Sequence, residues 1–293
     1  MWRRVGMVVV LVGSLLAVSA PADAAVHLTY VHSKKRTMGP FAAGVRRTAM
    51  CPAGTQVIGG GGWVSDSFNG ESSLMASFPI DGPDRGKRPD DGWRVLGNNN
   101  STATVLEVQA WAVCADRGRY AYRTSPVSNV NNAAQASNIA VCAVGEKVTG
   151  GGGSVTGTHV EIELGGTIPE DVDVDNVFDN GWSVVFNNDS GVQQQFQAFA
   201  ICSKSGGPYS YTAGEEAISG SGSFTHEDPC PSGEKVVSGG FFAHSSNRNF
   251  EVQVLRPIDD DDANSRPDDG WRTGAGIVSP STESESRIVC RRV

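Results

Sequence analysis

Three copies of one cassette run through this chain, and this repetition restricts its fold more than any other feature of the sequence. The heptapeptide RPDDGWR occupies residues 88–94 and returns at residues 266–272. Between them lies FDNGWS, whose Trp182 is 89 residues away from both Trp93 and Trp271. The repeat predicts three similar units, each holding several secondary-structure elements.

Other landmarks recur in the same order. Each copy contains an opening motif (CPAG, CAVG or CPSG), a proline two residues before an aspartate, a Gly-Trp pair and a closing cysteine in AVC, AIC or IVC. We therefore divide the chain into an N-terminal segment at residues 1–24, copy 1 at residues 25–114, copy 2 at residues 115–203 and copy 3 at residues 204–293.

The residue pattern inside each copy predicts β-strands. Segments such as TQVIGGGGWVS and EKVTGGGGSVT follow a turn and alternate apolar with small residues, and shorter alternating runs such as VEIEL end at a proline. No long stretch carries the apolar stripe of a helix. We expect an all-β chain of antiparallel sheets. The short connections between copies favour one β-prism-like body with pseudo-threefold symmetry, and three tandem small β-sandwich domains are the alternative.

One tryptophan per copy follows a tight turn. Asp-Asp-Gly and Asp-Asn-Gly are turn sequences, because glycine accepts a positive φ and the acid or amide can bond its own backbone. A tryptophan that enters a strand directly from such a turn can bury a large apolar area. Trp93, Trp182 and Trp271 are therefore expected to lie in the core of their repeats, and exposed rings that stack on sugars are the alternative.

Six cysteines allow 15 pairings. An oxidising compartment favours disulfides, and the repeat favours one bridge inside each copy. The expected bridges are Cys51–Cys114, Cys142–Cys202 and Cys230–Cys290. The spacing that a zinc site needs, CxxC or HxxxH, is absent from the sequence.

The first residues predict export. Arg3 and Arg4 precede an uncharged apolar run, and small residues around Ala24 suit cleavage by a signal peptidase. Residues 1–24 are interpreted as a signal peptide, and the protein as secreted and extracellular, without insertion in a membrane. Removing two arginines and Asp23 would change the net charge from −8 to −9, which argues against nucleic acid as a partner.

The sequence shows no catalytic pattern. The five histidines fall at unrelated positions of the cassette, and GxSxG is absent. Acidic loops between the proline landmark and the Gly-Trp pair offer hard oxygen ligands, so calcium is the one cofactor considered. The candidate calcium ligands are Asp81, Asp91, Asp171, Asp179, Asp259 and Asp269.

The cassette CPxG…GGG…P…GW…AVC is similar to repeats of secreted actinobacterial proteins. More distantly, a threefold repeat with Cys-Pro-x-Gly before a glycine-containing strand resembles the vitelline membrane outer layer protein I family, and this resemblance implies a β-prism of three sheets. The copies here are longer, at about 89 residues, and carry the DDGW turn.

These observations together predict a monomeric, non-catalytic protein that binds a glycan or another ligand of the cell envelope at an extracellular surface. A structural or matrix protein without a small ligand is the second hypothesis, and an extracellular hydrolase is the third.

Overall fold

The computed structural model describes residues 26–65, 71–82, 86–204, 207–218, 222–244, 248, 250–259, 264–277 and 282–293. The expected signal peptide lies outside these residues, as do parts of the acidic loops of copies 1 and 3. All regular elements of the described part are β-strands, and these strands pair in antiparallel fashion. The expected all-β class is confirmed.

The strands form three sheets, named A, B and C here, with six strands in the main path of each. Sheet A has the order β1 (Leu28–His32), β7 (Leu106–Ala115), β4 (Gln56–Val64), β18 (Phe250–Ile258), β19 (Gly270–Ile277) and β16 (Gly222–Pro229). Sheet B has the order β3 (Ala42–Met50), β6 (Gly92–Asn99), β5 (Ser72–Ile80), β11 (Lys147–Val155), β14 (Gln194–Ser203) and β8 (Tyr120–Thr124). Sheet C has the order β10 (Ala134–Val141), β13 (Gly181–Asn188), β12 (Ile162–Glu170), β17 (Glu234–Ala243), β20 (Thr282–Arg292) and β15 (Tyr209–Ile218). Two short strands are added, β2 (Arg36–Met38) beside β7 and β9 (Ser128–Val130) beside β14.

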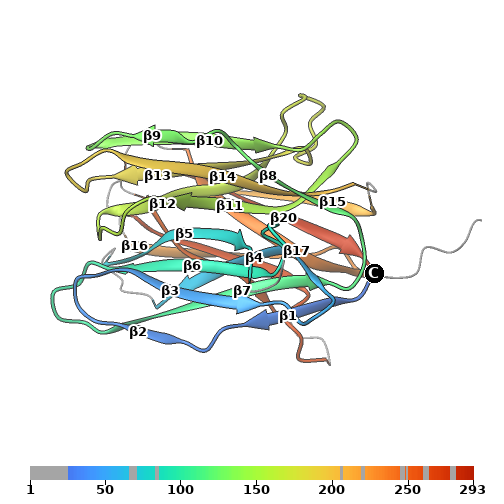
Figure 1. Ribbon diagram of the computed structural model, residues 1–293, viewed down its shortest axis with the longest axis horizontal. Helices are drawn as coiled ribbons and strands as arrows, with labels where there is room; N and C mark the ends of the chain where they lie inside the picture. The colour runs from blue at the N-terminus through green and yellow to red at the C-terminus, as the bar shows by residue number, and fades with distance from the viewer. Residues whose placement is uncertain are drawn as a thin grey trace, which may run out of the picture.

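Every sheet contains strands of two copies. Sheet A joins copy 1 to copy 3, sheet B joins copy 1 to copy 2, and sheet C joins copy 2 to copy 3. In Figure 1 the strands run roughly along the long axis of the molecule, with those of copy 2 uppermost and those of copy 1 lowest. Because each copy divides its strands between two sheets, tandem independent domains are excluded. The single β-prism-like body is confirmed.

Each copy packs its two half-sheets face to face. In copy 1, β4 contacts β5 and β6, while β7 contacts β3 and β6. The disulfides close these sandwiches. Cys51 follows β3 of sheet B and bonds Cys114 in β7 of sheet A, with 5.7 Å between the Cα atoms. The other two bridges are Cys142–Cys202, between sheets C and B, and Cys230–Cys290, between sheets A and C. The three bridges are the expected ones.

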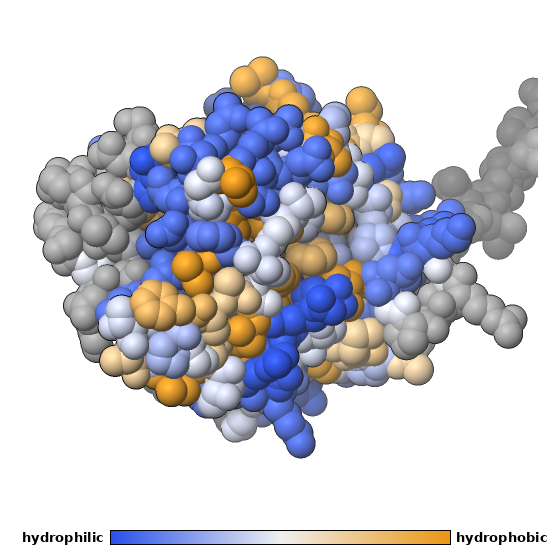
Figure 2. Space-filling model, turned by 60° about the vertical axis from the view of Figure 1, so that its left-hand side comes forward, coloured by the Kyte–Doolittle hydropathy of each residue, from blue (hydrophilic) through white to orange (hydrophobic). Residues whose placement is uncertain are grey.

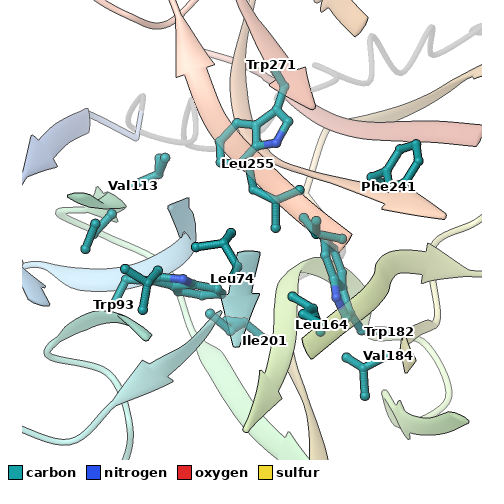
Figure 3. Close-up of a cluster of buried hydrophobic side chains, with 14 of the residues drawn as sticks. Leu74, Trp93, Val113, Leu164, Trp182, Val184, Ile201, Phe241, Leu255 and Trp271 are labelled. Carbon is teal, nitrogen blue, oxygen red and sulfur yellow. The ribbon is translucent and has the colours of Figure 1, made fainter. Parts of the chain in front are cut away.

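The repeated tryptophans fill the cores, as Figure 3 shows for the three indoles and the leucines between them. Trp93, Trp182 and Trp271 are at most 1% exposed, so stacking of these rings on a ligand is excluded. A glycine of the facing strand makes room for each ring. A Cβ atom at Gly60, Gly151 or Gly239 would stand within 2.4 Å of the indole of its own copy.

The backbone hydrogen bonds of its turn explain why the heptapeptide recurs. The backbone carbonyl of Asp90 accepts a hydrogen bond from the amide of Val57 (2.8 Å), and that of Asp91 accepts one from Cys51 (2.8 Å). The equivalent turns of copies 2 and 3 bond Val148 and Cys142, and Val236 and Cys230. The DDGW turn thus anchors the opening motif of its copy, which is why the two sequences recur together.

The copies also interlock near the pseudo-threefold axis, where the opening strands β4, β11 and β17 contact one another. A tyrosine of each lead-in strand donates its hydroxyl to a backbone carbonyl in the preceding copy, cyclically, at 2.7 Å. The pairs are Tyr30 with Val236, Tyr122 with Val57 and Tyr211 with Val148.

The outer surface is mixed in character. On the face that Figure 2 shows, hydrophobic residues form groups that hydrophilic residues interrupt. Within the described ranges, no helix has the length and apolar character needed to cross a bilayer.

Candidate functional site

The two halves of each sheet meet at a narrow junction. In sheet A, β4 and β18 pair only through Gly62 with Leu255 and Trp63 with Val254. Arg256 therefore stands opposite Gly61 in the register. A Cβ atom on Gly61 would lie 2.1 Å from the carbonyl oxygen of Leu255, so the strands approach too closely for any other residue.

A single row of residues crosses sheet A at this junction. On the copy 1 side, His32 pairs with Trp111, and Trp111 pairs with Gly61. On the copy 3 side, Arg256 pairs with Arg272, and Arg272 pairs with Glu227. Trp111 stands between the core residues Ala110 and Ala112, so its side chain points away from the core. Arg256 follows the core residue Leu255 and likewise faces outward.

The pseudo-threefold symmetry produces the same junction in the other two sheets. There, side chains of the protein itself occupy the junction. In sheet B the counterparts of Trp111 and Arg256 are Phe199 and Phe78, and Gly152 replaces Gly61. The two phenylalanine rings stack across the junction with centroids 5.6 Å apart and an interplanar angle of 22°. They cover the glycine between them.

In sheet C the counterpart of Trp111 is Arg287, beside Gly240. Its guanidinium donates to the carbonyl oxygen of Pro169 (2.7 Å) and to the carboxylate of Glu170 (3.0 Å). The ring of Phe178, from the acidic loop of copy 2, lies 3.6 Å from the Arg287 guanidinium carbon. This junction is therefore closed by contacts within the protein.

Sheet A differs because its junction is open. A cavity of about 690 Å³, named groove A here, is lined on one side by Trp111, His32 and Tyr30 and on the other by Arg256 and Arg272. The His32 and Trp111 rings lie 4.8 Å apart at 46°. A cavity of this volume is in the range that small ligands occupy.

The polar groups of groove A are incompletely bonded. Arg272 forms an ion pair with Glu227, but the Nε atoms of Arg256 and Arg272 and the Nε1 atom of Trp111 are buried without a partner in the described part of the chain. Burial, and then the charge of Arg272, lower the pKa of Arg256. Two guanidinium groups directly opposite each other in a sheet repel, so an anion between them would be stabilising.

Three of the acidic candidates have partners within the protein. Asp179 is buried and paired with Lys147. Asp269 lies 3.6 Å from Lys235, and Asp91 accepts a hydrogen bond from the amide of Gly82 (2.6 Å). Asp81 and Asp259 are exposed at the ends of β5 and β18.

Asp171 is the one candidate that belongs to an acidic group with metal-compatible spacing in the described ranges. One carboxylate oxygen of Asp171 and one each of Asp173 and Asp175 lie within 4.8 Å of one another, in the loop that follows β12. The Asp171 carboxylate accepts hydrogen bonds from the amides of Asn176 (2.7 Å) and Asp175 (3.3 Å), which shape this loop without any ion.

Sequence reasoning did not single out the residues of groove A. The sequence does carry a usable signal for Trp111, because this residue stands between Ala110 and Ala112 in an alternating strand and therefore faces away from them. Arg256 and Arg272 neighbour the Pro257 and Trp271 landmarks, but only the register between copies 1 and 3 brings them to Trp111. A scan of protein-family models and a search of curated proteins found no match to the chain.

Proposed function

We propose that this chain is a secreted, non-catalytic binding protein and that groove A holds an acidic glycan of an extracellular surface. The observation that carries the proposal is the difference among three equivalent junctions. Two are filled by the protein's own side chains, whereas the third is open and lined by an aromatic face and two arginines.

The chemistry of groove A suits an acidic sugar. The faces of Trp111 and His32 offer a surface on which a sugar ring can stack, and Arg256 and Arg272 offer donors for a carboxylate. Among the described residues that line the cavity there are three arginines and two acids, Glu227 and Asp259, in a chain whose net charge is −8. A locally basic cavity in an acidic protein favours an anionic ligand.

Binding is favoured over hydrolysis because Glu227 is tied to Arg272. A glycosidase needs one carboxyl group that holds a proton near neutral pH, and an ion pair with arginine stabilises the charged form instead. Three disulfides suit the oxidising compartment in which a secreted protein works.

Calorimetric titration of the purified protein with oligogalacturonate tests the proposal, with the carboxyl-reduced neutral oligosaccharide as the matched ligand. The acidic ligand should bind and the neutral one should bind more weakly. Trp111→Ala should abolish binding, and Arg256→Gln should weaken it about tenfold or more. Phe78→Ala, in the filled junction of sheet B, is the control and should leave the affinity unchanged. Equal effects of the two aromatic substitutions, or no binding of either ligand, would contradict the proposal.

A further inference from the structure

Three equivalent strands, one from each copy, meet at one end of the pseudo-threefold axis. β5, β12 and β18 contact one another there, and the equivalent positions near their first residues hold Ser73, Glu163 and Glu251. The assignment follows from the register, in which these residues pair with Asn98, Asn187 and Gly276. Ser73 is fully buried, and each glutamate is 7% exposed.

Amide side chains tie these strands together. Asn98 donates to the carbonyl oxygen of Ile162 (2.8 Å), and Asn187 donates to that of Phe250 (2.7 Å). Copy 3 has a glycine at the position of these asparagines. Gln253 instead completes a ring of three hydrogen bonds by donating to the carbonyl oxygen of Ser72 (2.9 Å). Each bonded carbonyl belongs to the residue immediately before Ser73, Glu163 or Glu251. The ring thus holds these three residues around the axis.

Three oxygens inside this ring lack partners among the described residues. They are Glu251 Oε2, Ser73 Oγ and Asn100 Oδ1, which are buried and accept no hydrogen bond from that part of the chain. Asn100 reaches the cluster, because its Nδ2 atom donates to Glu163 Oε1 at 3.2 Å. The ion pairs found among the described residues include none to Glu163 or Glu251.

The carboxyl groups of the two glutamates form a hydrogen bond with each other, and no described residue forms an ion pair with either of them. Burial raises the pKa of both carboxyl groups, that of Glu163 to about 8, and the charge of Glu163 raises the pKa of Glu251 further. Two buried carboxylates must share a proton or hold a cation to remain together. A shared proton would satisfy Glu251 alone, and it would leave Ser73 Oγ and Asn100 Oδ1 unpaired.

We propose that Glu163, Glu251, Ser73 and Asn100 bind one calcium ion at the end of the axis, so that the ion joins all three copies. The ligand set consists only of oxygens, which are the atoms that calcium prefers. Its two carboxylates match the charge of a divalent cation. Magnesium, which is smaller and retains several waters, should bind more weakly in a buried site of this kind.

Thermal unfolding of the purified, chelator-treated protein tests the site, with calcium chloride and magnesium chloride added in separate arms. Calcium should raise Tm by several degrees and magnesium by less, because a ligand of the folded state stabilises it. Glu163→Gln/Glu251→Gln should lose this response. The matched control is Asp171→Asn/Asp173→Asn/Asp175→Asn, which removes the exposed acidic group and should retain the response.

Three results would overturn the proposal. They are a wild-type Tm that calcium does not change, a response that the double glutamine variant keeps, and a response that the loop variant loses. If the double variant fails to fold, Ser73→Ala replaces it, since that change removes only an unpartnered oxygen. Calorimetric titration of Ser73→Ala with calcium should then show weaker affinity than wild type, and equal affinity would contradict the site.

Discussion

The three copies differ in whether the buried indole nitrogen of the repeated tryptophan has a hydrogen-bond acceptor. Trp93 donates to Ser77 Oγ (2.8 Å), and Trp182 donates to Thr167 Oγ1 (2.7 Å). The equivalent residue of copy 3 is Leu255, which lies next to the Trp271 indole in Figure 3, and Nε1 of Trp271 has no hydrogen-bond partner among the described residues. Copy 3 has replaced a hydrogen bond by apolar packing.

Thr167→Val should therefore lower the free energy of unfolding by about 1–3 kcal/mol, because it leaves the Trp182 nitrogen buried and unpaired. Thr273→Val is the matched control. Thr273 is fully buried and its Oγ1 atom has no hydrogen-bond partner in the described part of the chain, so the same change there should be neutral or stabilising. Urea unfolding of both variants measures the difference, and equal effects would show that the indole hydrogen bond contributes nothing.

The three interlocking tyrosines predict a dependence on pH. Burial raises the pKa of Tyr30, Tyr122 and Tyr211, and the nearest aspartates of the neighbouring copy's DDGW or DNGW turn raise it further. A group whose folded-state pKa is raised gives its full stability below the unfolded value, about 10 for tyrosine. That stability falls as the pH rises from about 10 toward the higher folded-state pKa.

Denaturant midpoints measured between pH 8 and pH 11 test this prediction. The wild-type protein should lose stability above about pH 10 by at most about 1.4 kcal/mol per pH unit for each tyrosine. The triple variant Tyr30→Phe/Tyr122→Phe/Tyr211→Phe should be less stable at pH 8, because three hydrogen bonds are missing, but should show a flatter profile above pH 10. Parallel profiles for the two proteins would contradict the prediction.

At the scale of the strand, successive glycines of β4 and β11 alternate between two kinds of close contact, one with buried side chains of the same copy and one with the backbone of another copy. In β11, Gly151 faces Trp182 of its own copy, whereas Gly152 faces the backbone of β5 in copy 1. The sequence shows the alternation of apolar with small residues in these strands. It could not show that the second face meets another copy, because the pairing partner of a strand edge is not encoded within the strand.

Gly152→Ala should destabilise the protein by about 3 kcal/mol or more, since its Cβ atom would stand 1.9 Å from the carbonyl oxygen of Ser77. Gly39→Ala is the control, because no described atom lies within 4 Å of a Cβ atom at that position. This substitution should change the stability by no more than about 0.5 kcal/mol. Thermal melts of the two variants measure the contrast. A Gly152→Ala variant as stable as wild type would show that the strands can move apart.

At the scale of the whole molecule, the sequence predicted what lies inside a copy better than what lies between copies. The strands, the buried tryptophans and the disulfides follow from residues that recur at one period. The sequence offers the acidic loops as candidate ion ligands. In the structure Lys147 and Lys235, two residues after the opening glycine, form ion pairs with the turn aspartates of their own copies. That recurring lysine was a signal in the sequence. Groove A and the axial glutamates were not predictable, because they depend on the exchange of half-sheets between copies.

This exchange gives a prediction for an isolated copy. Residues 115–203 contain half of sheet B and half of sheet C, and in the whole protein each half pairs with another copy at β11 and at β12. A single fragment would expose both edges. Three fragments can pair β11 of one with β12 of the next and close the same ring, so the fragment should form a trimer or precipitate. Light scattering measures its mass.

Gly152→Ala in the same fragment provides the control. In the whole protein Gly240 of β17 lies against the carbonyl oxygen of Thr167 in β12. In the trimer Gly152 of β11 would take the place of Gly240, so its added methyl group would collide with that oxygen. The variant should fail to form the soluble trimer. A monomeric fragment with a sharp melting transition would contradict the prediction, because it would mean that one copy buries enough surface to fold without the strands of its neighbours.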